Sequence, residues 1–324
     1  MSGPATGPGT TPPAVSVVVP AFQVAPYIAE ALASVVAQTW RDWELILVND
    51  GSPDTPALEQ AIAPFRDRIT YLTQENRGAG AARNAAIRVA RGEWLAFLDG
   101  DDAWFPGYLE RQMAELEARG LDLVWSDGLM RGDPGREGVR MTVDSPSHGP
   151  VTVEALLWQR VIVFTSATVV RRAAVVAVGG FEEGPVRAED FVLWVRLVQQ
   201  GFRAGYHHEP LIWYRVRRDG LSGDDVSAAL RVATVFRHLS DCPWLGADHR
   251  AIAARQHRDA EALHAAELGK RSLMAREHRD ARRYFAEARR WEGSPKRTGH
   301  YLLVCLAPGI ARWLLRRRRP GRLS

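Results

Sequence analysis

The feature that most constrains the fold is an alternation of short apolar runs with helical stretches along the first hundred residues. Residues 15–20 form an apolar run that ends in proline, which is typical of a strand buried on both faces. Residues 27–39 then space their apolar side chains as one face of a helix does. The alternation continues with predicted strands at 44–49, 69–73 and 94–98 and predicted helices at 56–65 and 79–91. This pattern predicts an α/β fold with a mostly parallel sheet flanked by helices, and ligands at the carboxyl ends of its strands.

The rest of the chain is less regular. We expect residues 130–150, which are rich in Gly, Pro and charge, to form a mobile loop. The other predicted elements before residue 224 are helices at 108–119, 153–158 and 189–200 and strands at 121–125, 166–170, 203–207 and 211–216. After residue 224 we expect only helices, at 226–239 and 249–291. The predicted organisation is a disordered N-terminus (1–13), an α/β domain (14–222), a helical extension (223–298) and a basic amphipathic tail (299–324).

Charge is distributed unevenly over the 324 residues. The formal net charge is +4, but the last 55 residues hold 16 Lys and Arg against 4 Asp and Glu, so the remainder is acidic. An acidic body with a basic tail argues against a main domain that binds nucleic acid. It favours a body that handles a metal or a small molecule.

Cysteine content and the N-terminus predict the compartment. The two cysteines, Cys242 and Cys305, have neither the number nor the spacing of a disulfide framework or a zinc site. Residues 1–13 lack the basic and apolar regions of a signal peptide. We therefore expect a cytoplasmic protein.

Three carboxylates follow the predicted strand at 94–98, namely Asp99, Asp101 and Asp102. At a strand end they would repel one another unless a cation were present, and hard oxygen ligands suit Mg²⁺ or Mn²⁺ together with phosphate oxygens. The alternative is a solvated acidic turn that caps the next helix.

Two other strand ends carry polar or small residues. Asp50 could accept hydrogen bonds from a nucleobase or ribose, or belong to an ordinary Asp-Gly turn. Residues 76–84 join a strand to a helix, where backbone N–H groups and guanidinium groups suit a phosphate or nucleotide edge. The segment nearly matches the dinucleotide pattern Gly-x-Gly-x-x-Gly, but Arg83 occupies the third glycine position, which argues against a nicotinamide-dependent oxidoreductase.

Taken in order, these segments resemble the motifs of family 2 inverting glycosyltransferases with the GT-A fold. The resemblance is carried by VVVPAF (17–22), VNDGS (48–52), NRG with ARN (76–84) and FLDGDD (97–102), followed by GGF (179–181), ED (189–190), LWVRL (193–197) and YR (214–215). It covers about residues 15–222. Two positions depart from the family pattern: Gln23 holds a place that is commonly Asn, and Arg217 one that is often His.

The resemblance implies a role for each matching residue. A nucleotide-diphosphate sugar, most often a uridine one, would be bound by Pro20, Ala21, Phe22, Asp50, Arg77, Gly78 and Asp99. Asp101, with Asp99, would hold a divalent metal, Mn²⁺ or Mg²⁺, that neutralises the leaving diphosphate. Asp190 would be the general base that takes the proton of an acceptor hydroxyl, so that transfer proceeds with inversion. The acceptor, whether a glycan, a lipid-linked molecule or a small molecule, is not implied.

Two alternatives remain at this stage. Asp190 precedes an amphipathic helix, where an acid can serve only as a cap. A non-catalytic nucleotide-sugar-binding or scaffold protein would keep the same fold, although Asp101 and Asp190 together argue against that reading.

The tail combines an apolar stretch, 301–315, with the arginines of 316–319 and Arg322. Such a segment can lie in the headgroup layer of an anionic membrane, or pack on the protein and end in a solvated basic tag. We expect peripheral contact with the inner face of the cytoplasmic membrane.

Overall fold

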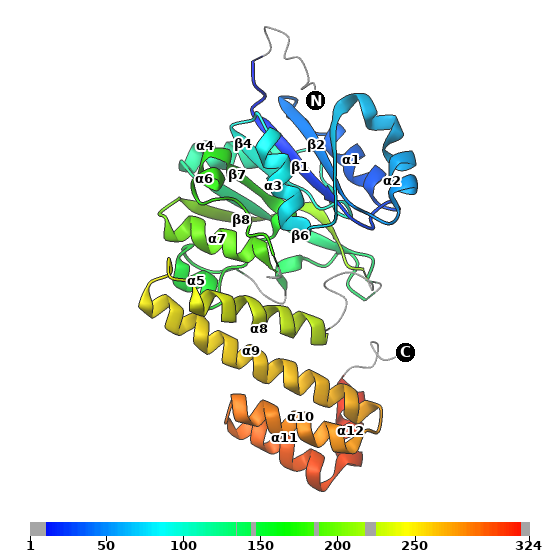
Figure 1. Ribbon diagram of the computed structural model, residues 1–324, viewed down its shortest axis with the longest axis vertical. Coiled ribbons are helices and arrows are strands. Elements are labelled where there is room, and N and C mark those ends of the chain that lie inside the picture. Colours follow the sequence, from blue (N-terminus) through cyan, green and yellow to red (C-terminus); the bar gives the residue numbers. More distant parts are fainter. Residues whose placement is uncertain (1–10, 134, 144–146, 185–187, 218–224, 319–324) are drawn as a thin grey trace. The chain divides into compact units, whose positions relative to one another are not determined.

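The computed structural model describes residues 11–133, 135–143, 147–184, 188–217 and 225–318 (Figure 1). The chain divides into two units: Met1–Pro185 with Glu189–Val216, and Val186–Ala188 with Arg217–Ser324. The predicted boundary between residues 222 and 223 lies outside the described residues. So do residues 1–10 of the predicted disordered start and residues 319–324 of the predicted tail.

An eight-stranded sheet forms the centre of the first unit. Its strands are β1 (Val15–Ala21), β2 (Trp43–Asp50), β3 (Ile69–Gln74), β4 (Trp94–Phe97), β5 (Ala103–Trp104), β6 (Leu123–Arg131), β7 (Thr168–Arg171) and β8 (Ala204–Arg215). The spatial order is β3-β2-β1-β4-β7-β6-β8-β5. The first four strands in this order pair in parallel, as do β6 and β8, whereas β7 and β5 run antiparallel to their neighbours. The α/β prediction is therefore confirmed, as a mixed sheet.

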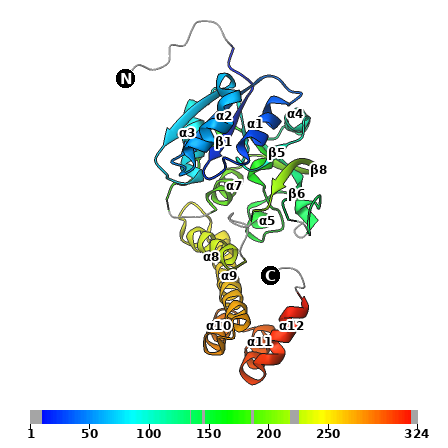
Figure 2. The ribbon, with the colours of Figure 1, turned by 90° about the vertical axis from the view of Figure 1, so that its right-hand side faces the viewer.

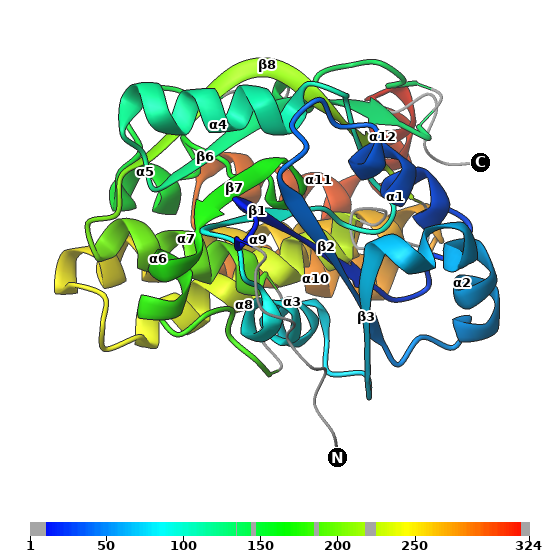
Figure 3. The same ribbon diagram turned by 90° about the horizontal axis from the view of Figure 1, so that it is seen from above.

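Helices cover both faces of this sheet (Figure 3). The main hydrophobic core joins alternate residues of β1, β2 and β4 to α1 (Ile28–Val36), α2 (Thr55–Ile62) and α4 (Tyr108–Arg119). On the opposite face lie α3 (Ala79–Val89) and α7 (Glu189–Gln199). There Phe97 packs edge-on against Phe181, with ring centroids 5.2 Å apart, and lies 6.2 Å from the ring of Trp194. The remaining elements of this unit are α5 (Val153–Leu157), α6 (Arg172–Ala177) and the short 3₁₀ turns η1 (Ala63–Arg68), η2 (Met141–Val143) and η3 (Thr165–Ala167).

Two expectations for the first unit are corrected. The predicted strands 203–207 and 211–216 are the one strand β8, because its pairing with β6 shifts register between Trp125 and Asp127 and so absorbs the polar residues around Pro210. The predicted mobile loop 130–150 is in part ordered, since Leu129 bridges Arg140 and the hydroxyl of Thr142 donates to buried Asp127 (2.6 Å).

The second unit contains only helices among its described residues. They are α8 (Asp225–Asp241), α9 (Ala247–Met274), α10 (His278–Trp291), α11 (Pro295–Leu306) and α12 (Pro308–Arg318). Consecutive helices contact one another, and α12 also contacts α9 (Figure 2). The helical pattern predicted over 249–291 is divided in two, because Arg276 adopts a left-handed backbone (φ 66°) and the amide of Glu277 donates to the carbonyl of Ser272. No helix of the described residues is long and apolar enough to cross a membrane.

Candidate active site

The site lies at the carboxyl edge of the parallel strands. β1 pairs with β2 on one side and β4 on the other, which is the topological switch point where open α/β sheets bind ligands. The loops after β1 and β4 touch: a Cβ added to Gly100 would lie 2.9 Å from the side chain of Val24 and 3.2 Å from the carbonyl oxygen of Pro20. A side chain at residue 100 would therefore push the acidic loop away from β1.

Three candidate residues lie at the end of β1 and directly after it, and one of them is exposed. Phe22 is 39% exposed, whereas Ala21 is fully buried in the main core and Pro20 is half-buried. A ligand at this edge can therefore meet the ring of Phe22, whereas Ala21 is covered. The next residue, Gln23, has a left-handed backbone with a φ of 54°. Asn tolerates that conformation better than Gln does, which gives a physical reason for the Asn common at this place in the family.

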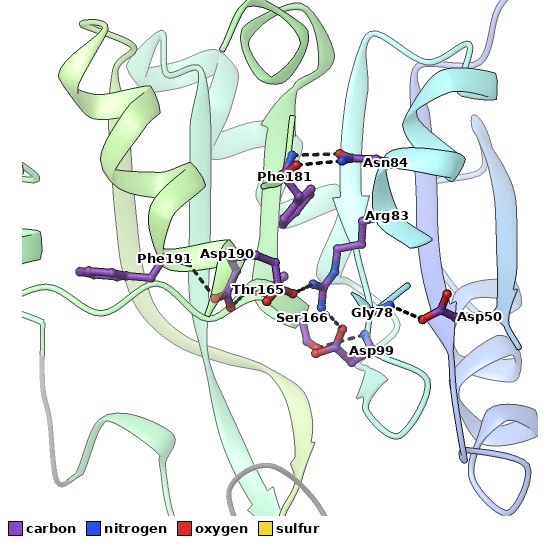
Figure 4. Close-up of polar contacts among 11 residues, drawn as sticks. Asp50, Gly78, Arg83, Asn84, Asp99, Thr165, Ser166, Phe181, Asp190 and Phe191 are labelled. Carbon is purple, nitrogen blue, oxygen red and sulfur yellow. Dashed lines mark hydrogen bonds and ion pairs between the residues drawn. The ribbon is translucent and has the colours of Figure 1, made fainter. Parts of the chain in front are cut away.

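Asp50 organises the loop before α3. It is 3% exposed, and its carboxylate accepts hydrogen bonds from the backbone amides of Arg77 (3.0 Å) and Gly78 (2.8 Å) and from the side-chain amide of Gln74 (2.7 Å). Gly78 has a φ of 90°, a conformation that favours glycine. The structure thus brings Asp50, Arg77 and Gly78 together, with Asp50 buried rather than on the surface of the loop. Figure 4 shows the bond between Asp50 and Gly78. The exposed guanidinium of Arg77 pairs with Glu183.

A buried arginine links two of the site's carboxylates. Arg83, on α3, is 4% exposed; its guanidinium donates to Asp99 (2.6 Å), after β4, and to Glu189 (3.0 Å), the first residue of α7. Burial alone would lower the pKa of Arg83, but the charges of Asp99 and Glu189 outweigh it and raise this pKa above its ordinary value. Arg83 is therefore a permanent cation between two segments that lie 90 residues apart in sequence (Figure 4).

The acidic loop has one deeply buried member. Asp102 is 3% exposed and accepts a hydrogen bond from the backbone amide of Arg215 (2.8 Å), while its Oδ2 has no hydrogen-bond partner among the described residues. Burial, together with the charges of Asp101 and Asp99, raises the pKa of Asp102 well above its ordinary value. Asp99 keeps 35% of its side chain exposed, and its backbone amide donates to the hydroxyl of Ser166 (3.1 Å).

These acids fit a divalent cation of the kind that completes its shell with phosphate oxygens. Among the described residues no group of three or more His, Cys, Asp and Glu side chains could hold a metal on its own. Mg²⁺ in nucleotide sites usually takes only one or two carboxylates and receives its other ligands from phosphates and water. A bound cation would relieve the repulsion among the neighbouring carboxylates Asp99, Asp101 and Asp102.

Asp190 lies in the first turn of α7, next to Glu189. One carboxylate oxygen accepts a hydrogen bond from the hydroxyl of Thr165 (2.7 Å), and the other accepts one from the backbone amide of Phe191 (2.8 Å). Both contacts fix the orientation of the carboxylate (Figure 4). Burial raises the pKa of Glu189; Arg83 lowers it and Asp190 raises it, and the net shift is upward.

The GGF segment (179–181), which precedes α7, is tied to α3 by a further contact. The side-chain amide of Asn84 donates to the carbonyl of Phe181 (2.8 Å) and accepts from the amide of Phe181 (2.9 Å). The preceding Gly180 has a φ of 76°, and a Cβ there would lie 2.6 Å from Asn84 Oδ1. The GGF segment is therefore held closely against α3.

Five residues of this site have no role predicted from the sequence, namely Arg83, Asn84, Thr165, Ser166 and Glu189. Arg83 belongs to the ARN motif and breaks a glycine pattern, but neither observation gave it a role of its own. One signal could have found it. The first turn of α3 contains only Gly and Ala apart from Arg83, so a guanidinium there stands out at a buried position. Thr165 and Ser166 carry no comparable signal, because their place is set by the antiparallel pairing of β7 with β4.

Comparison with known proteins identifies the family. The family described as Glycosyl transferase family 2 matches residues 16–179. The putative teichuronic acid biosynthesis glycosyltransferase TuaG of Bacillus subtilis is 30% identical over 233 residues, which are 70% of this chain and 88% of that protein. The putative glycosyltransferase EpsE of the same organism is 31% identical over 64% of this chain and 74% of its own length.

Solved structures agree on the fold. The mannosyltransferase PcManGT of Pyrobaculum calidifontis superposes with a TM-score of 0.62 at 22% identity, over 96% of this chain and 82% of that one. Residues 1–349 of TarS from S. aureus superpose with a TM-score of 0.59 at 18% identity, over 86% of this chain and 92% of that one. The predicted family and GT-A fold are thus confirmed: the chain belongs to glycosyl transferase family 2 and is a glycosyltransferase.

Proposed function

We propose that the protein transfers a sugar from a nucleoside diphosphate sugar, with uridine as the nucleoside, to an acceptor hydroxyl with inversion, and that Asp190 is the general base. The observation that carries this proposal is the pair of bonds from Arg83 to Asp99 and Glu189. They join the acidic loop at the donor edge of the sheet to the helix start that bears Asp190. We further propose that the enzyme works in the cytoplasm.

The donor site is proposed along the carboxyl edge. The nucleoside would lie near Phe22 and the loop held by Asp50, where the backbone around Arg77 and Gly78 begins α3. The N-terminus of a helix favours negative charge, which suits a diphosphate. PcManGT was solved with GDP-Man and Mn²⁺, and TarS with UDP-GlcNAc. Both structures support a nucleotide sugar as the donor, and because their nucleobases differ, experiment must decide between uracil and guanine.

A divalent cation is proposed as cofactor, held by Asp101 and Asp99. When bound, Mn²⁺ or Mg²⁺ would act as a Lewis acid that neutralises charge on the leaving diphosphate. Arg83 would keep Asp99 aimed at the site, since it bonds one carboxylate oxygen.

The proposed reaction is a single displacement. Asp190 takes the proton of the acceptor hydroxyl while the acceptor oxygen forms a bond to the anomeric carbon. The bond from that carbon to the phosphate oxygen breaks, and its electron pair leaves with the diphosphate. The bonds from Thr165 and Phe191 hold the carboxylate of Asp190 in one orientation. A base fixed in this way is preorganised to take a proton from an acceptor hydroxyl that binds within hydrogen-bond reach.

The test separates donor binding from turnover. We expect Asp190→Asn to bind UDP with Mn²⁺ as the wild type does, by calorimetry, because the amide keeps the shape of the carboxylate. Release of UDP from sugar donors, measured over a panel of acceptors, should fall about 10²-fold or more, the usual contribution of a general base. Asp248→Asn changes an acid in the first turn of α9 in the same way and should alter neither quantity. Turnover of Asp190→Asn within about threefold of wild type would refute the assigned base.

The same titrations test the nucleoside and the metal. UDP should bind more tightly than GDP, and removal of Mn²⁺ or the change Asp101→Ala should weaken UDP binding. UDP binding that is equally tight with and without Mn²⁺ would contradict the proposed role of Asp101. Tight donor binding by the wild type without any release of UDP would instead favour the non-catalytic alternative.

A further inference from the structure

The two C-terminal helices expose an unusual amount of apolar surface. Leu306 is 82% exposed and Ile310 56%, on either side of the junction between α11 and α12. Three more large apolar side chains of these helices are at least 39% exposed, so the set comprises Leu302, Leu306, Ile310, Trp313 and Leu314. We call these five residues the C-terminal apolar face. Several large apolar side chains exposed near one another mark an interaction site more often than single ones do.

Other side chains of the same helices are packed. Val304 and Ala311 are buried with Phe285 in the core of the second unit. On α11, Leu302 and Leu306 are four residues apart and so share a face of the helix, as Ile310 and Leu314 do on α12. The helices are therefore anchored inward while the C-terminal apolar face stays exposed.

The segment that carries this face has charge of one sign in its sequence. Residues 293–324 contain eight Lys and Arg and no Asp or Glu. The mutual repulsion of such segments disfavours a second copy of the same face as partner. A membrane with anionic lipids offers negative headgroups directly above hydrocarbon, so one surface satisfies both the cations and the apolar side chains.

We propose that the C-terminal apolar face docks on the surface of an anionic membrane. α11 and α12 have 12 and 11 residues, so each is about 16–18 Å long, short of a hydrocarbon core of about 30 Å. The helices lie in the interface with their exposed side chains inserted among the headgroups and upper acyl chains. This docking goes beyond the proposed sugar transfer and does not depend on it.

Co-sedimentation of the full chain with vesicles tests the proposal. One set of vesicles is pure phosphatidylcholine, and the other contains about one-third phosphatidylglycerol. We expect the wild type to partition into the anionic vesicles at least about tenfold better, and this preference to weaken as salt is raised.

A matched pair of variants identifies the surface. Leu306→Gln with Ile310→Gln should reduce partitioning about tenfold or more. Leu230→Gln with Leu263→Gln changes two residues of α8 and α9 that are 46% and 42% exposed, and should leave it unchanged. Circular dichroism and UDP binding, measured on every variant, show that each is folded and separate this proposal from the one on function.

Three results would overturn the proposal. They are absence of vesicle binding by the wild type, equal binding to neutral and anionic vesicles, and equal losses in the two double variants. Concentration-dependent association that disappears in Leu306→Gln with Ile310→Gln, without vesicle binding, would replace the membrane by a second copy of the chain.

Discussion

At the scale of single residues, Arg83 is the side chain that joins the proposed donor edge to the segment bearing the proposed base. Its guanidinium is surrounded by Asp99, Glu189 and Asp190, all of which raise the pKa of Arg83. Removing one partner of a buried ion pair strands the other, at a cost of about 3–5 kcal/mol. A planar guanidinium can bond two carboxylates in different directions, which the point charge of Lys cannot do in the same geometry. Arg83 is therefore a positioning residue for both the donor edge and the start of α7.

We expect Arg83→Lys to fold but to turn over more slowly. Because the ammonium cannot keep both bonds, kcat should fall about tenfold or more while the KM for donor changes less. Arg83 lowers the pKa of Glu189, so a weaker contact should let that pKa rise. Protonated Glu189 no longer holds the start of α7 through residue 83, so the acidic limb of the rate profile should move to higher pH. Steady-state kinetics across pH measure both effects.

The control is the exposed pair Arg91 with Glu44. Arg91 is 56% exposed, so Arg91→Lys should change stability by under about 1 kcal/mol and leave the kinetics unaltered. A purely structural role for Arg83 would appear as lost stability with unchanged kcat and an unshifted pH profile, and would contradict the positioning role.

Some positions of the site residues follow from the sequence, and others depend on tertiary packing. Asp50, Arg77, Gly78 and Asp99 could be placed at one edge because each follows a parallel strand, and parallel strands end together. Arg83 could not, because its partners Asp99 and Glu189 are set by tertiary packing of α3 against the start of α7. The burial of Ala21, in contrast, could have been read from the alternation that places Val15, Val17 and Val19 in the same core.

At the scale of elements, close helix packing in the second unit depends on Gly269. This glycine lies within α9, and a Cβ there would come 2.9 Å from the ring of Phe285 on α10. Gly299, within α11, has nothing within 4 Å of the same imagined atom. The two glycines therefore differ in packing while both lie in helices.

We expect Gly269→Val to destabilise the second unit by about 1–3 kcal/mol, since α9 and α10 must separate or Phe285 must leave its place. Gly299→Ala should be neutral or stabilising by up to about 1 kcal/mol, because alanine favours the helix. Hydrogen exchange of peptides from α9 and α10, read by mass spectrometry, measures both. Unchanged protection in Gly269→Val would show that the contact with Phe285 is not needed.

Element boundaries show what periodicity misses. The long helical pattern over 249–291 contains no proline or glycine at its actual break, so the left-handed Arg276 could not be foreseen. β5 has only two residues, Ala103 and Trp104, and exists because it pairs with β8, a partner more than 100 residues away. The six-residue helix α6, which follows β7 directly, was likewise not predicted. Long periodic elements such as α4 were predicted with the observed bounds, because their own residues determine them.

At the scale of the whole molecule, the division into two units separates the proposed tasks. Every residue proposed for donor binding, metal binding or catalysis belongs to the first unit, and the C-terminal apolar face belongs to the second. The two also differ in kind: the first is built on a mixed sheet, whereas the described part of the second has helices and a largely alanine core. Units with separate cores commonly unfold in separate steps.

We therefore expect calorimetry of the full chain to show two unfolding transitions that respond to different changes. UDP with Mn²⁺ at about a hundredfold above its dissociation constant adds about 2.7 kcal/mol to the folded first unit, which should raise one transition by about 5–10 °C. Gly269→Val should lower only the other transition, because its clash with Phe285 lies wholly in the second unit. Gly299→Ala, a substitution of a helical glycine in the same unit that causes no clash, should lower neither transition. A single transition that moves with both the nucleotide and Gly269→Val would show that the two units unfold as one, and that the separation of tasks does not extend to stability.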